Sequence, residues 1–316
     1  MSVLRSRVLL CTVLGTITAG GASPGTGHER RLLAALLVWR RTVVSADRLT
    51  DVLWPDGAPP TATNTLQSKI SRLRRLVGPG VLIRVGSGYV LELPEHGCDA
   101  DRFTDLVAGA DGLEPLARLA ILDEALGLWT GRAYDDFADE DFARPAASGL
   151  EQRRLTAEEK RLEALLSLGH YDEVISAAEE LIVEDPFRET FWAAEMEALH
   201  RSGRSVDALR CYTRARDRFI DETGLPPSTR LSAIEQTILL DERAPEPGLD
   251  PGSEPGSEPG SGRIDDEAGT SGRPPTPVVD PLDRPDEPAP PVRVDPSPST
   301  GRRAQDRGAE STDRSS

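Results

Sequence analysis

The side chains best suited to chemistry lie in one segment, NTLQSKISRLRRLV, which spans residues 64–77. Its apolar residues recur at spacings of four, three and four and so predict one buried helical stripe: Leu66, Ile70, Leu73 and Val77. At about 100° per residue, the opposite side carries amide, hydroxyl and guanidinium groups. These groups belong to Asn64, Ser68, Ser71 and Arg75, with Arg72 beside them. Such side chains match the base edges in the major groove of DNA, where arginine suits guanine and asparagine suits adenine.

The flanks of the same helix carry Gln67, Lys69 and Arg74. Cationic flanks suit phosphates, which fix a protein on DNA without reading its sequence. The alternative is an amphipathic helix with an ordinary solvated basic face. The surrounding elements decide between the two interpretations, because a DNA reader needs a fold that presents this face.

Two helices are expected before this segment. Residues 28–40 (HERRLLAALLVWR) predict the first, and Ser45 caps a second that runs to Trp54. Pro59-Pro60 introduces the polar-faced helix, which ends near Gly78. Three consecutive helices of this kind are typical of a helix-turn-helix domain.

A hairpin is expected after the third helix. The strands VLIRV and YVLEL are joined by Gly86-Ser87-Gly88. A phosphate-cradling loop is the alternative, but Walker or dinucleotide spacing is missing and no helix follows directly. We therefore predict the wing of a winged helix, with Arg84 and Ser87 near the DNA backbone or minor groove.

The N-terminal stretch, MSVLRSRVLLCTVLGTITAGGAS, has two interpretations. Two arginines before an apolar run and small residues are typical of a signal peptide. However, Thr12, Thr16 and Thr18 are β-branched, and Gly15 suits a turn between two short strands. Three widely spaced cysteines favour a reducing cytosol over a disulfide framework. We expect a small β-sheet before the first helix.

The charge is unevenly distributed along the chain. Residues 1–95 carry 12 basic and 6 acidic side chains, a net charge of +6, whereas residues 96–240 carry 16 and 30, a net charge of −14. A basic segment on an acidic chain is the footprint expected for a polyanion partner. The Pro/Gly-rich, acidic residues 244–316 have few apolar side chains and predict a disordered tail.

The sequence of residues 99–240 predicts helices throughout. Gly169 and Gly203 each precede a helix and lie 34 residues apart, which is the tetratricopeptide period. Two such units are too few for a freestanding solenoid, so the preceding helices must complete the core. Among these, a capping box is expected at Ser148 and Glu151, where the longest helix would begin.

No catalytic or metal-binding constellation is predicted. The four histidines fall in different elements, and His96-Gly97-Cys98-Asp99 lacks a second ligand pair at metal spacing. The acidic stretch YDDFADEDF (134–142) departs from the calcium-loop pattern. We therefore expect neither an enzyme nor a resident cofactor or metal.

The helix TLQSKISRLRRLVG, the wing GSGYVLEL and the block GRSVDALRCYTRARDRFIDETGLPPSTRL resemble the Streptomyces antibiotic regulatory protein family. The resemblance covers residues 5–240 and implies an OmpR-type winged helix joined to a bacterial transcriptional activator domain. It further implies binding to direct repeats in promoters of specialised-metabolite genes, and contact with the RNA polymerase holoenzyme. One departure concerns the wing, where Val85 occupies a place that is often arginine.

These observations combine into one expected architecture, mainly α: a winged helix with a small β-sheet and wing hairpin (1–95), a tetratricopeptide-like domain (99–240) and a disordered tail (244–316). We expect a sequence-specific transcriptional activator in the cytoplasm, associated with the nucleoid. Its expected partners are double-stranded promoter DNA, RNA polymerase and a second copy of the chain on DNA, with no membrane. The alternative is a tetratricopeptide-type adaptor that binds a protein or RNA.

Overall fold

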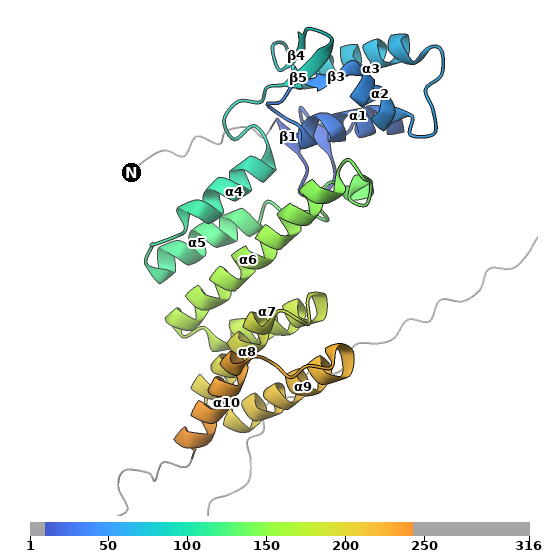
Figure 1. Cartoon of the computed structure of the whole chain (residues 1–316). Helices are drawn as coiled ribbons and strands as arrows, with labels where there is room; N and C mark the ends of the chain where they lie inside the picture. Colours follow the sequence, from blue (N-terminus) through green and yellow to red (C-terminus); the bar gives the residue numbers. More distant parts are fainter. Residues whose placement is uncertain (1–9, 243–316) are drawn as a thin grey trace, which may run out of the picture. The chain divides into compact units, whose positions relative to one another are not determined.

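Helices dominate the computed structural model, which describes residues 10–242 (Figure 1). The mainly α class predicted from the sequence is confirmed. Both the tail predicted over residues 244–316 and the first nine residues lie outside the described residues. Within residues 10–242, none of the helices has the length and apolar character that a membrane span requires.

The N-terminal segment forms the short strands that its β-branched residues predict. Strand β1 (Cys11–Thr12) pairs antiparallel with β2 (Thr18–Ala19). The turn between them buries Val13, Leu14 and Ile17. These apolar side chains therefore belong to the core of the protein.

Three helices follow close to the expected ranges, although the first ends at Val38 rather than at Arg40. Helix α1 (Gly27–Val38) is capped by Thr26, and α2 (Ala46–Leu53) by Ser45, whose hydroxyl accepts from the Arg48 amide at 3.1 Å. Helix α3 (Ala62–Val77) begins after the proline pair and ends at Gly78, whose φ of 90° favours glycine.

The wing is a three-stranded antiparallel sheet rather than a bare hairpin. Its order is β3-β5-β4, where β3 is Val44–Ser45, β4 is Leu82–Val85 and β5 is Gly88–Leu91. Strand β3, which the sequence did not predict, precedes α2 and pairs with Gly88 and Tyr89. A Cβ atom on Gly88 would lie 2.4 Å from the Val44 carbonyl oxygen, so glycine is needed where the strands meet.

Seven helices and one 3₁₀ turn complete the described chain. They are α4 (Asp99–Gly109), α5 (Pro115–Leu126), η1 (Asp135–Phe137), α6 (Arg144–Leu168), α7 (Tyr171–Glu184), α8 (Glu189–Arg201), α9 (Ser205–Thr223) and α10 (Thr229–Asp241). The helices predicted after Gly169 and Gly203 are α7 and α9, and each follows a glycine with positive φ.

The predicted start of α6 at a capping box is wrong. The helix begins one turn earlier, at Arg144, because Pro145 occupies a first-turn position where its missing N–H costs nothing. Ser148 therefore lies inside the helix. Glu151 instead accepts a hydrogen bond from the Ala133 amide at 2.8 Å and so ties α6 to the preceding loop.

The buried side chains form two cores that meet within α6. The first runs from β1 to the first half of α6 and unites Leu32 of α1 with Phe103 of α4 and Tyr134 of the loop after α5. The second joins the rest of α6 to helices α7–α10. The first core thus continues across residues 95–99, where we place the predicted boundary between the winged helix and the helical domain.

Asp99 connects the two sides of that boundary. Its side chain is only 2% exposed, and both oxygens accept from the Val13 amide at 2.9 Å. The Leu14 and Ala100 amides donate at 3.0 and 2.8 Å. Burial raises the pKa of Asp99 above its usual value, and the three N–H donors oppose that shift. The N-terminal segment is thereby fastened to the first turn of α4.

We expect Asp99→Asn to lower the free energy of unfolding by about 2 kcal/mol, because the new amide NH₂ would face backbone N–H donors that need an acceptor. Chemical denaturation followed by tryptophan fluorescence measures the loss. Asp51→Asn is the matched control, since Asp51 is exposed and has no side-chain partner among the described residues. Equal stability of the two variants would contradict the assigned role of Asp99.

Candidate nucleic-acid interface

Helix α3 has the two faces that the sequence predicts. Leu66, Ile70, Leu73 and Val77 are at most 2% exposed and pack in the first core. Of the eight polar residues predicted on the other side and flanks of α3, seven are exposed: Asn64, Gln67, Ser68, Ser71, Arg72, Arg74 and Arg75. The eighth, Lys69, is half-buried.

Five of these side chains are unengaged. Within residues 10–242, no side-chain hydrogen bond or ion pair occupies Asn64, Gln67, Ser68, Ser71 or Arg75. Amide, hydroxyl and guanidinium groups exposed in this way keep their hydrogen-bonding capacity for a ligand. Base edges and phosphates of DNA offer donors and acceptors that match these groups.

Lys69 and Arg72 are engaged within the protein. The Lys69 ammonium donates to the Glu29 carboxylate at 3.1 Å and to the Thr26 hydroxyl at 3.2 Å. Arg72 donates from Nη1 to the same Glu29 oxygen at 2.9 Å. Only 6% of the Glu29 side chain and 15% of the Lys69 side chain are exposed, whereas 51% of Arg72 is. The predicted phosphate contact of Lys69 stays a prediction, and Glu29 competes for its charge.

Glu29 remains ionised despite its burial. Desolvation acts to raise its pKa, but the hydrogen bonds and charges of Arg72 and Lys69 hold the pKa below its usual value. Glu29 also lies in the first turn of α1, where the helix dipole favours a negative charge. Sequence reasoning missed this residue, because an acidic residue in a first turn is an ordinary helix signal.

The wing presents its tip to solvent. Arg74 of α3 donates from Nε to the Leu82 carbonyl oxygen at 2.9 Å, which holds the base of the wing against the helix. Arg84 and Ser87 are exposed, and the Arg84 Nε lies 3.4 Å from the Gly86 carbonyl oxygen. Val85 is 45% exposed, so both faces of β4 are open near the turn. Arg84 thus reaches solvent although it is offset by one residue from the common arginine position.

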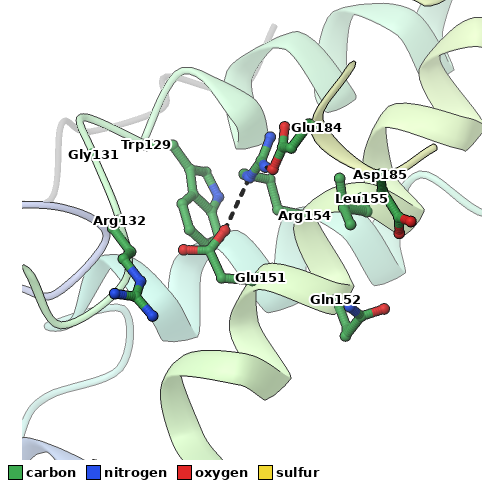
Figure 2. Close-up of a pocket in the computed structure, with 9 residues that line it drawn as sticks. All are labelled: Trp129, Gly131, Arg132, Glu151, Gln152, Arg154, Leu155, Glu184 and Asp185. Atoms are coloured by element: carbon green, nitrogen blue, oxygen red, sulfur yellow. Dashed lines mark hydrogen bonds and ion pairs between the residues drawn. The ribbon is translucent and has the colours of Figure 1, made fainter. Parts of the chain in front are cut away.

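A second candidate, a cavity of about 720 Å³, lies in the helical part (Figure 2). Arg154 lies over the Trp129 ring at 5.6 Å and forms ion pairs with Glu151 and Glu184. Its guanidinium is therefore already neutralised by two carboxylates. Within the described part of the chain, no group of three His, Cys, Asp or Glu residues could hold a metal ion.

Comparison with known families matches both parts of the fold. Residues 21–91 match the family described as "Transcriptional regulatory protein, C terminal", and residues 98–239 match "Bacterial transcriptional activator domain". The transcriptional regulator RedD of Streptomyces coelicolor is 32% identical over 245 residues, which cover 73% of this chain and 70% of RedD. The chain belongs to the Streptomyces antibiotic regulatory protein family.

Other members of the Streptomyces antibiotic regulatory protein family are similar to this chain. The transcriptional regulatory protein EmbR of Mycobacterium tuberculosis is 33% identical over 236 residues, covering 71% of this chain and 60% of EmbR. A solved structure of M. tuberculosis EmbR in complex with a low affinity phosphopeptide has a TM-score of 0.67 at 31% identity. The structural match covers 73% of this chain and 65% of the EmbR chain. This chain thus spans about 60% of the length of EmbR.

We expect Arg74→Ala to lower the free energy of unfolding by about 1 kcal/mol, because the variant loses the hydrogen bond that joins α3 to the wing. Arg75→Ala removes the same side chain one residue later and should change stability by less than about 0.5 kcal/mol. Denaturant unfolding of both variants measures the difference. Equal losses would mean that the bond to Leu82 contributes nothing.

Proposed function

We propose that this protein is a sequence-specific DNA-binding transcriptional activator, and that it acts on genes of specialised metabolism. The observation that carries the proposal is the α3 face, with five unengaged polar side chains opposite a buried stripe and beside an exposed wing. Membership of the Streptomyces antibiotic regulatory protein family supports the same function.

The proposed roles follow from position on the helix. Asn64, Ser68, Ser71 and Arg75 read base edges in the major groove, with Arg72 beside them. Gln67 and Arg74 lie on a flank of α3, and Arg84 and Ser87 lie on the wing, where phosphates are the nearest groups. Lys69 is not among the DNA ligands of this proposal, because its ammonium is paired with the buried Glu29 carboxylate.

The helical part serves activation in this proposal. Residues 96–240 carry a net charge of −14, which opposes close approach to DNA and leaves this part for protein partners. The RNA polymerase holoenzyme is the proposed partner, and a second copy of the chain occupies the neighbouring repeat of the promoter. The proposed activity consists of binding promoter DNA and recruiting RNA polymerase, and it requires no cofactor or metal.

A gel shift tests the proposal. The full chain is incubated with duplexes selected from a random DNA library through rounds of binding, and then with scrambled competitor. We expect a sequence-dependent complex that survives excess scrambled DNA. An adaptor that binds protein or RNA would instead enrich no consensus sequence, and that outcome would overturn the proposed function.

We expect Arg75→Ala to cost about 1–3 kcal/mol of binding free energy on the selected site and to relax preference at one base position. The planar fork of Arg75 can hold the O6 and N7 atoms of one guanine together, and the guanidinium has no competing partner in the described chain. Affinity for scrambled DNA should fall less. Fluorescence anisotropy on both DNAs measures the two losses.

The neighbouring Arg74→Ala is the matched comparison, because the proposal assigns Arg74 to phosphates: this variant should weaken binding to selected and scrambled DNA alike. Helices of this class often enter the groove by their N-terminal end. In that geometry Asn64 and Ser68 read the bases and Arg75 reaches only phosphate. An equal loss on both DNAs after Arg75→Ala would establish that geometry and refute base readout by Arg75.

A further inference from the structure

Two cations of α3 pair with one buried carboxylate, that of Glu29. Glu29 lies on α1, and its Oε1 atom accepts from both Lys69 and Arg72. The Thr26 hydroxyl, which caps α1 through the Glu29 amide at 3.2 Å, accepts a second bond from Lys69. One acidic group therefore holds two of the four cations that α3 carries.

We propose that Glu29 is a specificity-determining positioning residue, which keeps Lys69 off DNA phosphates and restrains Arg72 so that binding depends on base contacts. This inference rests on the proposed DNA-binding function. Glu29 itself touches no DNA in this scheme and acts only through Lys69 and Arg72.

Glu29 can affect specificity because of the way in which nonspecific affinity for DNA arises. Each cation that neutralises a phosphate releases counterions, and this term acts on every DNA sequence alike. A cation that is already paired with a buried carboxylate contributes little to it. Glu29 thus reduces nonspecific binding without affecting the unengaged base-reading groups, and the ratio of specific to nonspecific affinity rises.

The Glu29–Lys69 ion pair is difficult to displace because both side chains are largely buried. Exposed ion pairs in water exchange readily and contribute little. Here the Glu29 side chain is 6% exposed and that of Lys69 is 15% exposed, so a phosphate would have to displace a pair with little access to solvent. Arg72 is 51% exposed and uses one Nη atom on Glu29, which leaves its other donors for DNA.

The test compares Glu29→Gln with the wild-type full chain on the selected duplex and on scrambled DNA, over a range of salt concentrations. Glutamine keeps the shape and one acceptor oxygen but removes the charge. We expect tighter binding to scrambled DNA, a slope of log affinity against log salt steeper by about one to two units, and a lower specificity ratio. A purely structural role would weaken binding to both DNAs and would not steepen the slope.

Two further variants complete the test. Glu92→Gln removes the same charge from an exposed side chain that has no partner in residues 10–242, and should leave the slope unchanged. Lys69→Met in the wild-type background should also leave the slope unchanged, whereas in the Glu29→Gln background it should reverse about one unit of the increase. Thermal melting of each variant verifies folding.

The outcomes separate this inference from the proposed function. If Lys69→Met alone lowers the slope by about one unit, Lys69 contacts a phosphate in the wild type and the Glu29 proposal is refuted. Equal slopes for Glu29→Gln and Glu92→Gln refute it as well. A wild-type chain that does not distinguish selected from scrambled DNA refutes the proposed function, whatever the variants do.

Discussion

The buried carboxylate of Asp99 is the interaction on which the arrangement of the first core depends. It accepts from the Val13 and Leu14 amides, which follow β1, and from the Ala100 amide in the first turn of α4. The same N-terminal segment is held on its other edge, because the Thr130 and Tyr134 amides donate to the Leu14 and Val13 carbonyl oxygens. The segment after β1 is thus hydrogen-bonded on both sides, and its buried side chains pack in the same core as those of α1 and α3.

Ion pairs join the region of α1 to later segments of the chain. Arg40, which follows α1, binds Asp101 of α4, and Arg31 of α1 binds Glu140 in the loop before α6. The hydrophobic core is continuous across the same junction. These contacts and the continuous core join the two parts of the fold on either side of residues 95–99.

The sequence predicted those features that depend on neighbours along the chain. The buried stripe of α3, the Ser45 cap and the glycine at the end of α3 all follow from local spacing. Features that depend on contacts distant in sequence could not be predicted in the same way. The pairing of Glu29 with Lys69 joins residues 40 positions apart, and the interaction of Glu151 with the Ala133 amide replaced the capping box. Strand β3 was missed because two residues carry no period of their own.

The net charge of the basic segment overstates the field that DNA would meet. Of its described cations, six form ion pairs with carboxylates: Arg30, Arg31, Arg40, Arg41, Lys69 and Arg72. Arg48 lies over the Trp39 ring at 4.0 Å. The cations left without a carboxylate or aromatic partner, Arg74, Arg75 and Arg84, all lie on α3 and the wing. Since paired charges contribute little to long-range attraction, the effective positive charge is concentrated on these two elements. Pairing with carboxylates thus leaves the unpaired positive charge of this segment on α3 and the wing, which form the surface that we propose for DNA.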